Sequence, residues 1–284
     1  MNYDLAIAYR ICPYVSKPAQ GLPFAVDKLE LSEICLRSLI ASLGSIRAKF
    51  WVLLDGCPES YEEMFRRHIR PEDLVVLRFD PPLGNRATFG RQIDVLTKQD
   101  CASCVYFAED DYVYVPDQFG ALVEFLNSSD DVDFVSPYDH PDCYRLYLHR
   151  KRKWLGTDGR RHWRTASSTC LTFLTTRETV RRYESIFRSY SNGNDDCALW
   201  LSMTKDRVFN PLVFIRYLCR QEFYWKILVR AWIYCYRQLL FGHRAKLWVP
   251  VPGIATHLDK NGLSPGIDWT DLMRQQSVSE LCNR

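Results

Sequence analysis

The chain has 284 residues, of which 47% are hydrophobic and 25% are charged. This composition is typical of an ordinary globular protein and excludes a disordered or collagen-like chain. The 37 basic and 34 acidic residues leave a net charge of only +3. Nucleic-acid-binding proteins usually carry a clustered excess of basic residues, so we expect no nucleic-acid partner.

Short apolar runs alternate with segments of helical periodicity through the first half of the chain. The runs Leu5–Tyr9 and Phe50–Leu54 are typical of strands, and the segment between them follows a helical period that stops at Gly44. This alternation predicts βαβ units around a mostly parallel sheet, and therefore an α/β fold. The further elements expected there are a helix over 61–69, strands over 74–77, 104–108 and 133–136, and a long connection over 81–100.

The second half of the chain has a different pattern. Residues 143–164 are loop-like, and residues 167–175 alternate like an antiparallel strand. Helices are expected over 177–190 and from Asp195 to Leu201, where the acidic start suits the helix dipole. The segment between Pro211 and Pro250 has no internal proline and predicts one or two helices before a loop-rich tail. We therefore expect an α/β unit over 1–205 and a helical appendage over 206–284.

Carboxylates follow the expected strands where each one ends. Asp55 follows the second strand, and the run Glu109, Asp110 and Asp111 follows the fourth. Ligands of open α/β sheets bind outside the carboxyl ends of the strands, so these side chains mark the expected binding edge. Adjacent carboxylates repel one another unless a cation is present, and oxygen ligands suit Mg²⁺ or Mn²⁺. A solvated acidic turn is the simpler alternative.

The triad Glu109, Asp110 and Asp111, placed behind the apolar run 105–108, resembles the Asp-X-Asp motif of glycosyltransferases with the GT-A fold, in particular the inverting family 2. The resemblance covers about residues 1–205 and a stretch near His257. It implies a GT-A-like, Rossmann-like sheet flanked by helices. It also implies metal-dependent inverting transfer of a sugar from a nucleotide-diphosphate donor, with UDP favoured. The implied acceptor is a glycan or a lipid-linked molecule in polysaccharide or glycoconjugate synthesis.

By this resemblance Asp111 is a metal ligand, and Glu109 or Asp110 contacts the ribose or the donor sugar. Asp55 would contact the base, although an Asp before Gly56 is equally typical of a plain turn. The arginines ahead of the motif would neutralise the donor phosphates or simply face solvent. The donor-binding candidates are Tyr9, Arg10, Asp55, Arg86, Arg91, Glu109 and Asp110.

An inverting transfer needs a base for the acceptor hydroxyl, and the resemblance points to Asp195 and Asp196. The family has Glu-Asp at this position, so the choice between the two stays open, and we favour Asp196. Acids at a helix start also stabilise its dipole without any catalytic role. A late histidine supplies a further metal ligand in the family, which implies this role for His257; a hydrogen-bonded structural histidine is the alternative. The acceptor-side candidates are Asp139, His140, Trp163 and Arg164.

The segment 212–246 is rich in aromatic and basic residues. It holds seven Lys or Arg and a single acid, Glu222, for a net charge of +6, so the rest of the chain carries 3 − 6 = −3. A helix with these properties can lie in the headgroup region of an anionic membrane. Alternatively, its apolar side covers the core while its charged side faces water.

The amino terminus lacks the basic region of a signal peptide, and no uncharged apolar stretch reaches the roughly 18 residues that cross a bilayer. We therefore expect a cytoplasmic protein, at the inner face of the membrane if segment 212–246 binds lipid. Without a secretory signal the eleven cysteines are expected to be reduced. Two other functions remain open: a nucleotidyltransferase, and a non-catalytic membrane- or glycan-binding protein.

Overall fold

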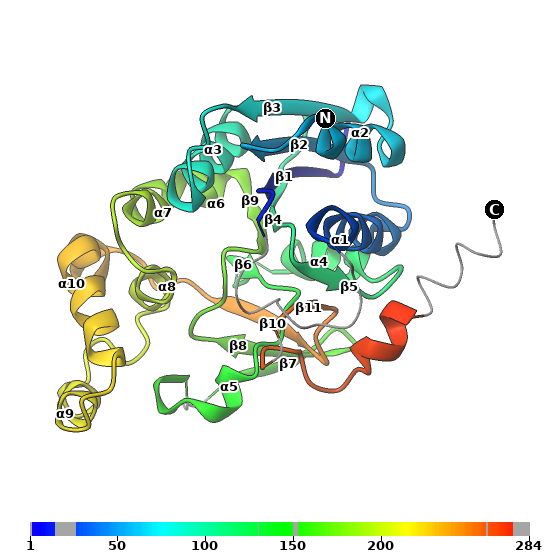
Figure 1. Cartoon of the computed structure of the whole chain (residues 1–284). Helices are drawn as coiled ribbons and strands as arrows, with labels where there is room; N and C mark the ends of the chain where they lie inside the picture. Colours follow the sequence, from blue (N-terminus) through cyan, green and yellow to red (C-terminus); the bar gives the residue numbers. More distant parts are fainter. Residues whose placement is uncertain (1, 15–26, 130, 150–152, 260, 275–284) are drawn as a thin grey trace.

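The computed structural model describes every residue except 1, 15–26, 130, 150–152, 260 and 275–284. The described residues form a nine-stranded sheet with helices on both faces and a smaller two-stranded sheet (Figure 1). The strands are β1 (Leu5–Ile11), β2 (Ala48–Asp55), β3 (Leu74–Phe79), β4 (Cys104–Glu109), β5 (Tyr112–Tyr114), β6 (Phe134–Val135), β7 (Leu155–Thr157), β8 (His162–Ala166), β9 (Phe173–Thr176), β10 (Leu247–Val251) and β11 (Ala255–His257).

The large sheet is mostly parallel, as the alternating pattern predicts. Its order is β3-β2-β1-β4-β9-β6-β10-β8-β7, and β5 pairs with β11 in the small sheet. Strands β1 to β4 pair in parallel, whereas β9 is antiparallel to both β4 and β6, and β8 is antiparallel to both β10 and β7. Only β9 and β8 therefore run against the other seven strands of this sheet. The predicted α/β class is confirmed.

The connections create a switch point beside β1. The chain runs from β1 to β2 and β3 on one side and then returns to place β4 on the other side of β1. In this register Arg10 lies opposite Glu109 at the carboxyl ends of β1 and β4. A crevice for a ligand forms at such a point because the neighbouring connections leave in opposite directions.

Ten labelled α-helices are described, and residues 269–274 are also helical. They are α1 (Lys28–Leu43), α2 (Glu59–His68), α3 (Asn85–Lys98), α4 (Phe119–Leu126), α5 (Asp142–Arg145), α6 (Arg177–Arg182), α7 (Glu184–Ser191), α8 (Asp196–Thr204), α9 (Pro211–Cys219) and α10 (Tyr224–Phe241). Two short 3₁₀ turns lie at Pro71–Asp73 and Tyr147–His149.

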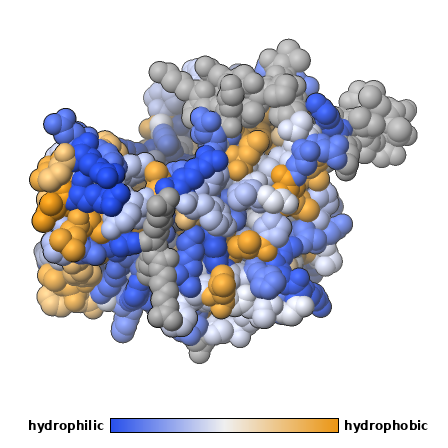
Figure 2. All heavy atoms as spheres, turned by 90° about the horizontal axis from the view of Figure 1, so that it is seen from below, coloured by the Kyte–Doolittle hydropathy of each residue, from blue (hydrophilic) through white to orange (hydrophobic). Residues whose placement is uncertain are grey.

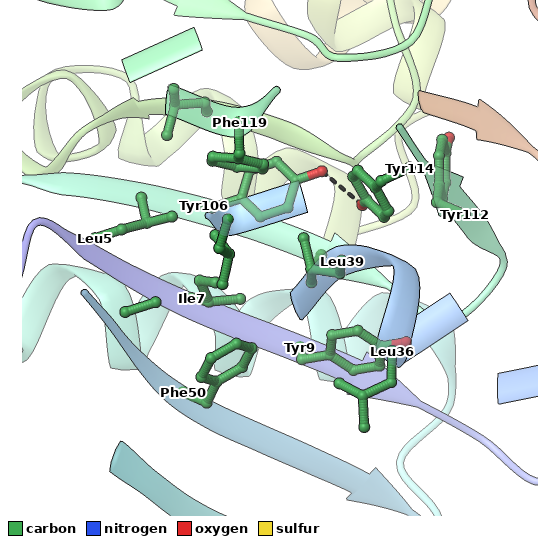
Figure 3. Close-up of a cluster of buried hydrophobic side chains, with 14 of the residues drawn as sticks. Leu5, Ile7, Tyr9, Leu36, Leu39, Phe50, Tyr106, Tyr112, Tyr114 and Phe119 are labelled. Atoms are coloured by element: carbon green, nitrogen blue, oxygen red, sulfur yellow. Dashed lines mark hydrogen bonds between the residues drawn. The ribbon is translucent and has the colours of Figure 1, made fainter. Parts of the chain in front are cut away.

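Each face of the sheet has its own apolar core. Helices α1, α2 and α4 cover one face, where Leu5 and Ile7 of β1 meet Leu36 and Leu39 of α1 (Figure 3). Helices α3, α6, α7 and α8 cover the other face. Burial of these large side chains is the main stabilising contribution, at roughly 25 cal/mol per Å² of apolar surface. The two cores together hold the carboxyl ends of β1, β2 and β4 at fixed positions.

The predicted long connection over 81–100 is wrong, because it contains α3. Gly84 precedes this helix with φ of 83°, and Phe89, Ile93 and Leu96 form its buried stripe. The pattern is masked because Gln92 is buried on the same side, where it donates hydrogen bonds to the carbonyls of Ala8 and Ala108. In the sequence, a buried polar residue that bonds to two strands therefore looks like an interruption of the apolar side of a helix.

Four further sequence expectations need correction. Residues 143–164 are not only loop, because they include β7 and the start of β8. The strand expected over 167–175 begins only at Phe173. The tail expected to be loop-rich contains β10 and β11. The expected helix over 177–190 is two helices, since Tyr183 has non-helical φ and ψ of −104° and 14°. The segment between Pro211 and Pro250 forms two helices, α9 and α10, which is within the one or two expected, and α10 packs against α8.

The ten cysteines in the described part of the chain are free thiols, as expected, and Cys282 lies outside it. No helix among the described residues is both long enough and apolar enough to span a bilayer.

Candidate active site at the sheet edge

A cavity of about 490 Å³ lies at the carboxyl ends of β1, β2 and β4. Its volume falls within the roughly 300–1,000 Å³ range of small-molecule sites. It is the switch-point crevice that the topology predicts. The charged residues that line it are Arg10, Lys28, Asp55, Glu109, Asp110 and Asp111.

Arg10 holds the first carboxylate of the triad. Its guanidinium forms an ion pair with Glu109 and donates a hydrogen bond to the carbonyl of Asn85 at 2.8 Å. The other carboxylate oxygen of Glu109 accepts from the Thr172 hydroxyl at 2.7 Å. Both oxygens of Glu109 therefore have partners, and this side chain links β1, β4 and the segment before β9.

Lys28 holds the second carboxylate. Its ammonium lies 2.7 Å from Asp110 Oδ2, and both side chains are largely buried. Burial raises the pKa of Asp110 to about 6, although the charge of Lys28 favours the carboxylate. The sequence interpretation missed Lys28. The available signal was its position at the first turn of the first helix, directly after the Asp27 cap, where the helix start faces the sheet edge.

Asp111 has a different environment. Its Oδ2 lies 3.0 Å from His257 Nε2, and its Oδ1 is buried without a hydrogen-bond partner. Burial alone would raise the pKa of Asp111, but the neighbouring His257 lowers it below its usual value. Asp111 in turn raises the pKa of His257 to about 9, against the opposing effect of burial. Pairing of β11 with β5, in which His257 lies opposite Tyr112, brings the two side chains together.

Asp55 lines the cavity but is already occupied by backbone groups. Its carboxylate accepts the Leu83 N–H at 2.5 Å and the Gly84 N–H at 2.9 Å. These bonds fix the turn that begins α3 and bring Gly84, Asn85 and Thr88 to the cavity wall. Asp55 therefore does stabilise a turn. This turn is the one before α3, in another connection, and not the one at Gly56.

Asp195 and Asp196 lie at the amino terminus of α8. Asp195 is the N-cap, and both carboxylates accept the Cys197 N–H, at 3.0 and 2.7 Å. Burial, together with the charge of Asp195, raises the pKa of Asp196 to about 7. Glu109 also contributes to this shift, so Asp196 lies within electrostatic reach of the triad. The capping role is thus present, and Asp196 is in addition a carboxylate that titrates near neutrality.

Three donor-binding candidates are not among the residues that line the cavity in the described structure. Tyr9 is buried and packs edge-on against Phe65 with ring centroids 5.3 Å apart. Arg86 lies over the Tyr190 ring, and Arg91 faces solvent with Asp94 at 3.4 Å. Alternation along β1 turns Tyr9 to the opposite face from Arg10, and both arginines lie on outward turns of α3, so a donor-binding role for these three side chains stays a prediction.

The four acceptor-side candidates are divided by the fold. Asp139 and Arg164 form a buried ion pair, and Asp139 also accepts from the Tyr144 hydroxyl at 2.6 Å. Trp163 is fully buried and stacked on Phe125, so its placement on an acceptor surface is wrong. The aromatic ring fills the core beneath β8 instead.

A second cavity, of about 510 Å³, lies beside this ion pair. Asp139, Tyr144, Pro252 and Pro265 are among its lining residues. His140, next in the chain, is partly exposed and packs against Tyr138, with ring centroids 5.0 Å apart. The ring centroids of Tyr138 and His257 lie 6.4 Å apart, so Tyr138 is a neighbour of both histidines.

No family model matches the chain, and no curated protein matches it either. Among solved structures the chain is similar to the galactosyltransferase LgtC, solved with donor and acceptor sugar analogues, at 13% identity and a TM-score of 0.40, over 69% of both chains. It is also similar to a mannosyltransferase from Pyrobaculum calidifontis, solved with GDP-Man and Mn²⁺, at 13% identity and a TM-score of 0.43, over 72% of this chain and 54% of that one.

A third similar structure is a CMP:2-keto-3-deoxy-manno-octonic acid synthetase with CTP, at 12% identity and a TM-score of 0.41, over 67% of this chain and 83% of that one. Two of these three similar structures are glycosyltransferases and the third is a nucleotide-dependent synthetase. With all three TM-scores below 0.5, the assignment of function depends on the site residues themselves.

Proposed function

We propose that the protein is a metal-dependent inverting glycosyltransferase that uses a nucleotide-diphosphate sugar. The observation that carries this proposal is Asp111, whose Oδ1 is buried at the cavity without a partner while its Oδ2 faces His257. An unpaired buried carboxylate oxygen is costly, and a bound cation removes that cost.

The donor set fits a hard divalent ion that takes few protein ligands. In the described part of the chain no three His, Cys, Asp or Glu side chains are grouped to hold a metal. Mg²⁺ and related ions commonly take one or two protein ligands and complete their coordination with substrate phosphates and water. Asp111 and His257 would hold Mn²⁺ or Mg²⁺ in this way. When bound, the ion would stabilise the negative charge on the departing diphosphate.

The cavity also contains groups suited to a nucleotide diphosphate. The amino terminus of α3, at Gly84 and Asn85, forms part of its wall, and helix amino termini favour anions. Lys28 supplies a buried cation nearby. We assign diphosphate contacts to these groups in place of Arg86 and Arg91, and we keep UDP as the favoured nucleotide from the sequence resemblance. Glu109 and Asp110 would contact the ribose or the donor sugar.

Asp196 is the proposed base. In the transfer, the acceptor oxygen forms a bond to the anomeric carbon, the bond from that carbon to the diphosphate breaks, and the hydroxyl proton passes to Asp196. A base works best with a pKa near the working pH, and burial beside Asp195 provides a pKa of about 7. The acceptor, a glycan or a lipid-linked molecule, would approach from the side of His140.

Nucleotidyl transfer remains the second candidate because of one observation. That reaction needs a basic group after the first strand, and Lys28, the first residue of α1, is such a group at the cavity. Its pairing with Asp110 lowers the availability of the ammonium for phosphate equally in both candidate reactions.

The products distinguish the two reactions. The protein would be incubated with nucleotide sugars and Mn²⁺, and separately with nucleoside triphosphates and sugar phosphates. We expect release of a nucleoside diphosphate from a nucleotide sugar, and we expect chelation of the metal and Asp111→Asn to abolish it. The control variant Asp100→Asn should retain it, because Asp100 is an exposed aspartate outside the cavity. Release of pyrophosphate from a triphosphate would instead establish nucleotidyl transfer.

A further inference from the structure

Exposed apolar side chains are concentrated on the helical appendage. Fifteen large hydrophobic residues are exposed in the described structure, and ten of them lie between Phe209 and Phe241. Viewed from below, their orange surface gathers at the left edge of the molecule, where Figure 1 places α9 and α10 (Figure 2). Single exposed apolar residues are ordinary, but a concentration of this kind marks a contact surface.

Helix α9 has apolar residues on both sides. Val213 and Tyr217 are buried against α8 and α10, whereas the outward positions Leu212, Ile215 and Leu218 are 72%, 51% and 48% exposed. Packing against the core therefore explains the inward apolar residues of this helix but not the outward ones. The outward side of α9 is covered by nothing in the described structure, and we name its three residues the apolar edge.

Basic side chains are also exposed on α9 and α10. Arg220 ends α9 in an exposed position, and Lys226 and Arg237 are exposed on the outward side of α10, where Ile233 and Leu240 are also exposed. Glu222 is the only acid between 212 and 246, and its contact with Arg220, at 3.8 Å, is long for an ion pair. Exposed cationic and apolar side chains thus lie on the same two helices, and residues 211–241 carry five Lys or Arg and one acid, for a net charge of 5 − 1 = +4.

We propose that α9 and the outward side of α10 bind the surface of an anionic bilayer, with the apolar edge inserted at the headgroup level and the basic residues on the lipid phosphates. The positive charge of this surface favours an anionic membrane over a second copy of the chain. Two copies of the chain meeting through this surface would bring two helix pairs of net charge +4 together, and like charges at close range oppose association. An anionic lipid surface neutralises the same charges while the apolar edge leaves water.

The helix lies on the membrane and does not cross it, because α9 has only nine residues. One apolar side of α9 and α10 covers the core, as one of the two sequence interpretations expects, and the proposal concerns the other side. The inference is independent of sugar transfer, since it concerns a surface formed by other residues than the cavity.

Binding to vesicles tests the proposal. The full chain would be sedimented with vesicles of phosphatidylcholine alone and of equal parts phosphatidylcholine and phosphatidylglycerol. We expect at least about tenfold tighter binding to the anionic vesicles, weakening as salt rises. The variant Leu212→Ser/Ile215→Ser/Leu218→Ser should lose most of this binding, whereas Trp154→Ser/Leu155→Ser, which removes exposed apolar residues near β7, should retain it.

A local readout is available in Cys219, the exposed cysteine at the end of α9. A polarity-sensitive fluorophore on Cys219, in a Cys282→Ser background, should shift to the blue on anionic vesicles. Equal binding to both vesicle types, or unchanged binding by the apolar-edge variant, would overturn the proposal. So would a concentration-dependent dimer that the same variant abolishes, because the surface would then be occupied by a second copy.

Discussion

His257 Nε2 lies 3.0 Å from Asp111 Oδ2, across 146 residues of sequence. The pairing of β11 with β5 creates this contact and makes the carboxyl-terminal strand part of the site. The boundary at residue 206 reflects a change in composition along the sequence. Residues on both sides of it nevertheless contribute to one candidate metal centre.

Replacing His257 with Ala should weaken Mn²⁺ binding. If the imidazole is a ligand, its loss should raise the dissociation constant for Mn²⁺ by about tenfold or more, the scale on which metal sites respond to lost partners. Titration of Mn²⁺ by electron paramagnetic resonance measures this directly. His162→Ala removes an exposed histidine from β8 and should change nothing; equal Mn²⁺ affinity in the two variants would make His257 structural.

Asp196→Asn should abolish transfer while the donor still binds. Loss of a general base typically costs roughly 10²–10⁴-fold in rate, so kcat should fall by that amount with little change in the KM for the donor. The matched variant is Asp195→Asn, because asparagine caps a helix about as well as aspartate and keeps the bond to the Cys197 N–H. If Asp195→Asn is the slower enzyme, the two roles are reversed.

The rate should rise with pH through about 7. A base must be deprotonated, and burial beside Asp195 places the pKa of Asp196 at about 7. The stability effect has the opposite sign: the folded pKa lies above the ordinary 3.8, so the contribution of this group is fully present below pH 3.8 and is lost as pH rises through about 7. The pH dependence of the rate and of the unfolding free energy would be measured for the native chain and for Asp196→Asn. Only the native chain should show the rise in rate and the loss of stability through about pH 7.

Arg164→Met should destabilise the fold. The guanidinium pairs with Asp139, and both side chains are buried, so its removal leaves an uncompensated carboxylate. Breaking a buried pair typically costs about 3–5 kcal/mol of unfolding free energy. The exposed Arg160, 3.7 Å from Glu124, is the control, since Arg160→Met should cost less than about 1 kcal/mol. Equal midpoints in urea would show that the buried pair contributes nothing to stability.

The parallel strands were predictable because their apolar runs are short, rich in β-branched residues and followed by polar groups. The edge at which Arg10, Asp55 and the acidic triad meet follows from the same pattern. Helix α3 was not predictable, since Gln92 interrupts its buried stripe in order to bond two strands. Trp163 shows the reverse error: an aromatic residue in a polar stretch looks available for a ligand, yet it stacks in the core.

Lys28 shows why the charge balance of the site could not be read from the sequence. Its partner Asp110 is distant along the chain, and only the packing of α1 against the sheet places the two 2.7 Å apart. The triad is consequently less negative than three consecutive acids suggest: Glu109 is paired with Arg10 and Asp110 with Lys28, while Asp111 keeps Oδ1 buried without a hydrogen-bond partner.

The most direct test of the central claim is calorimetric titration with UDP, GDP and their sugar conjugates, each with and without Mn²⁺, on the native chain, Asp111→Asn and Asp100→Asn. The proposed function predicts that one nucleotide binds only with Mn²⁺, that Asp111→Asn abolishes this binding, and that Asp100→Asn preserves it. Binding that is independent of Mn²⁺ and of Asp111, or no binding to any of these nucleotides, would contradict it.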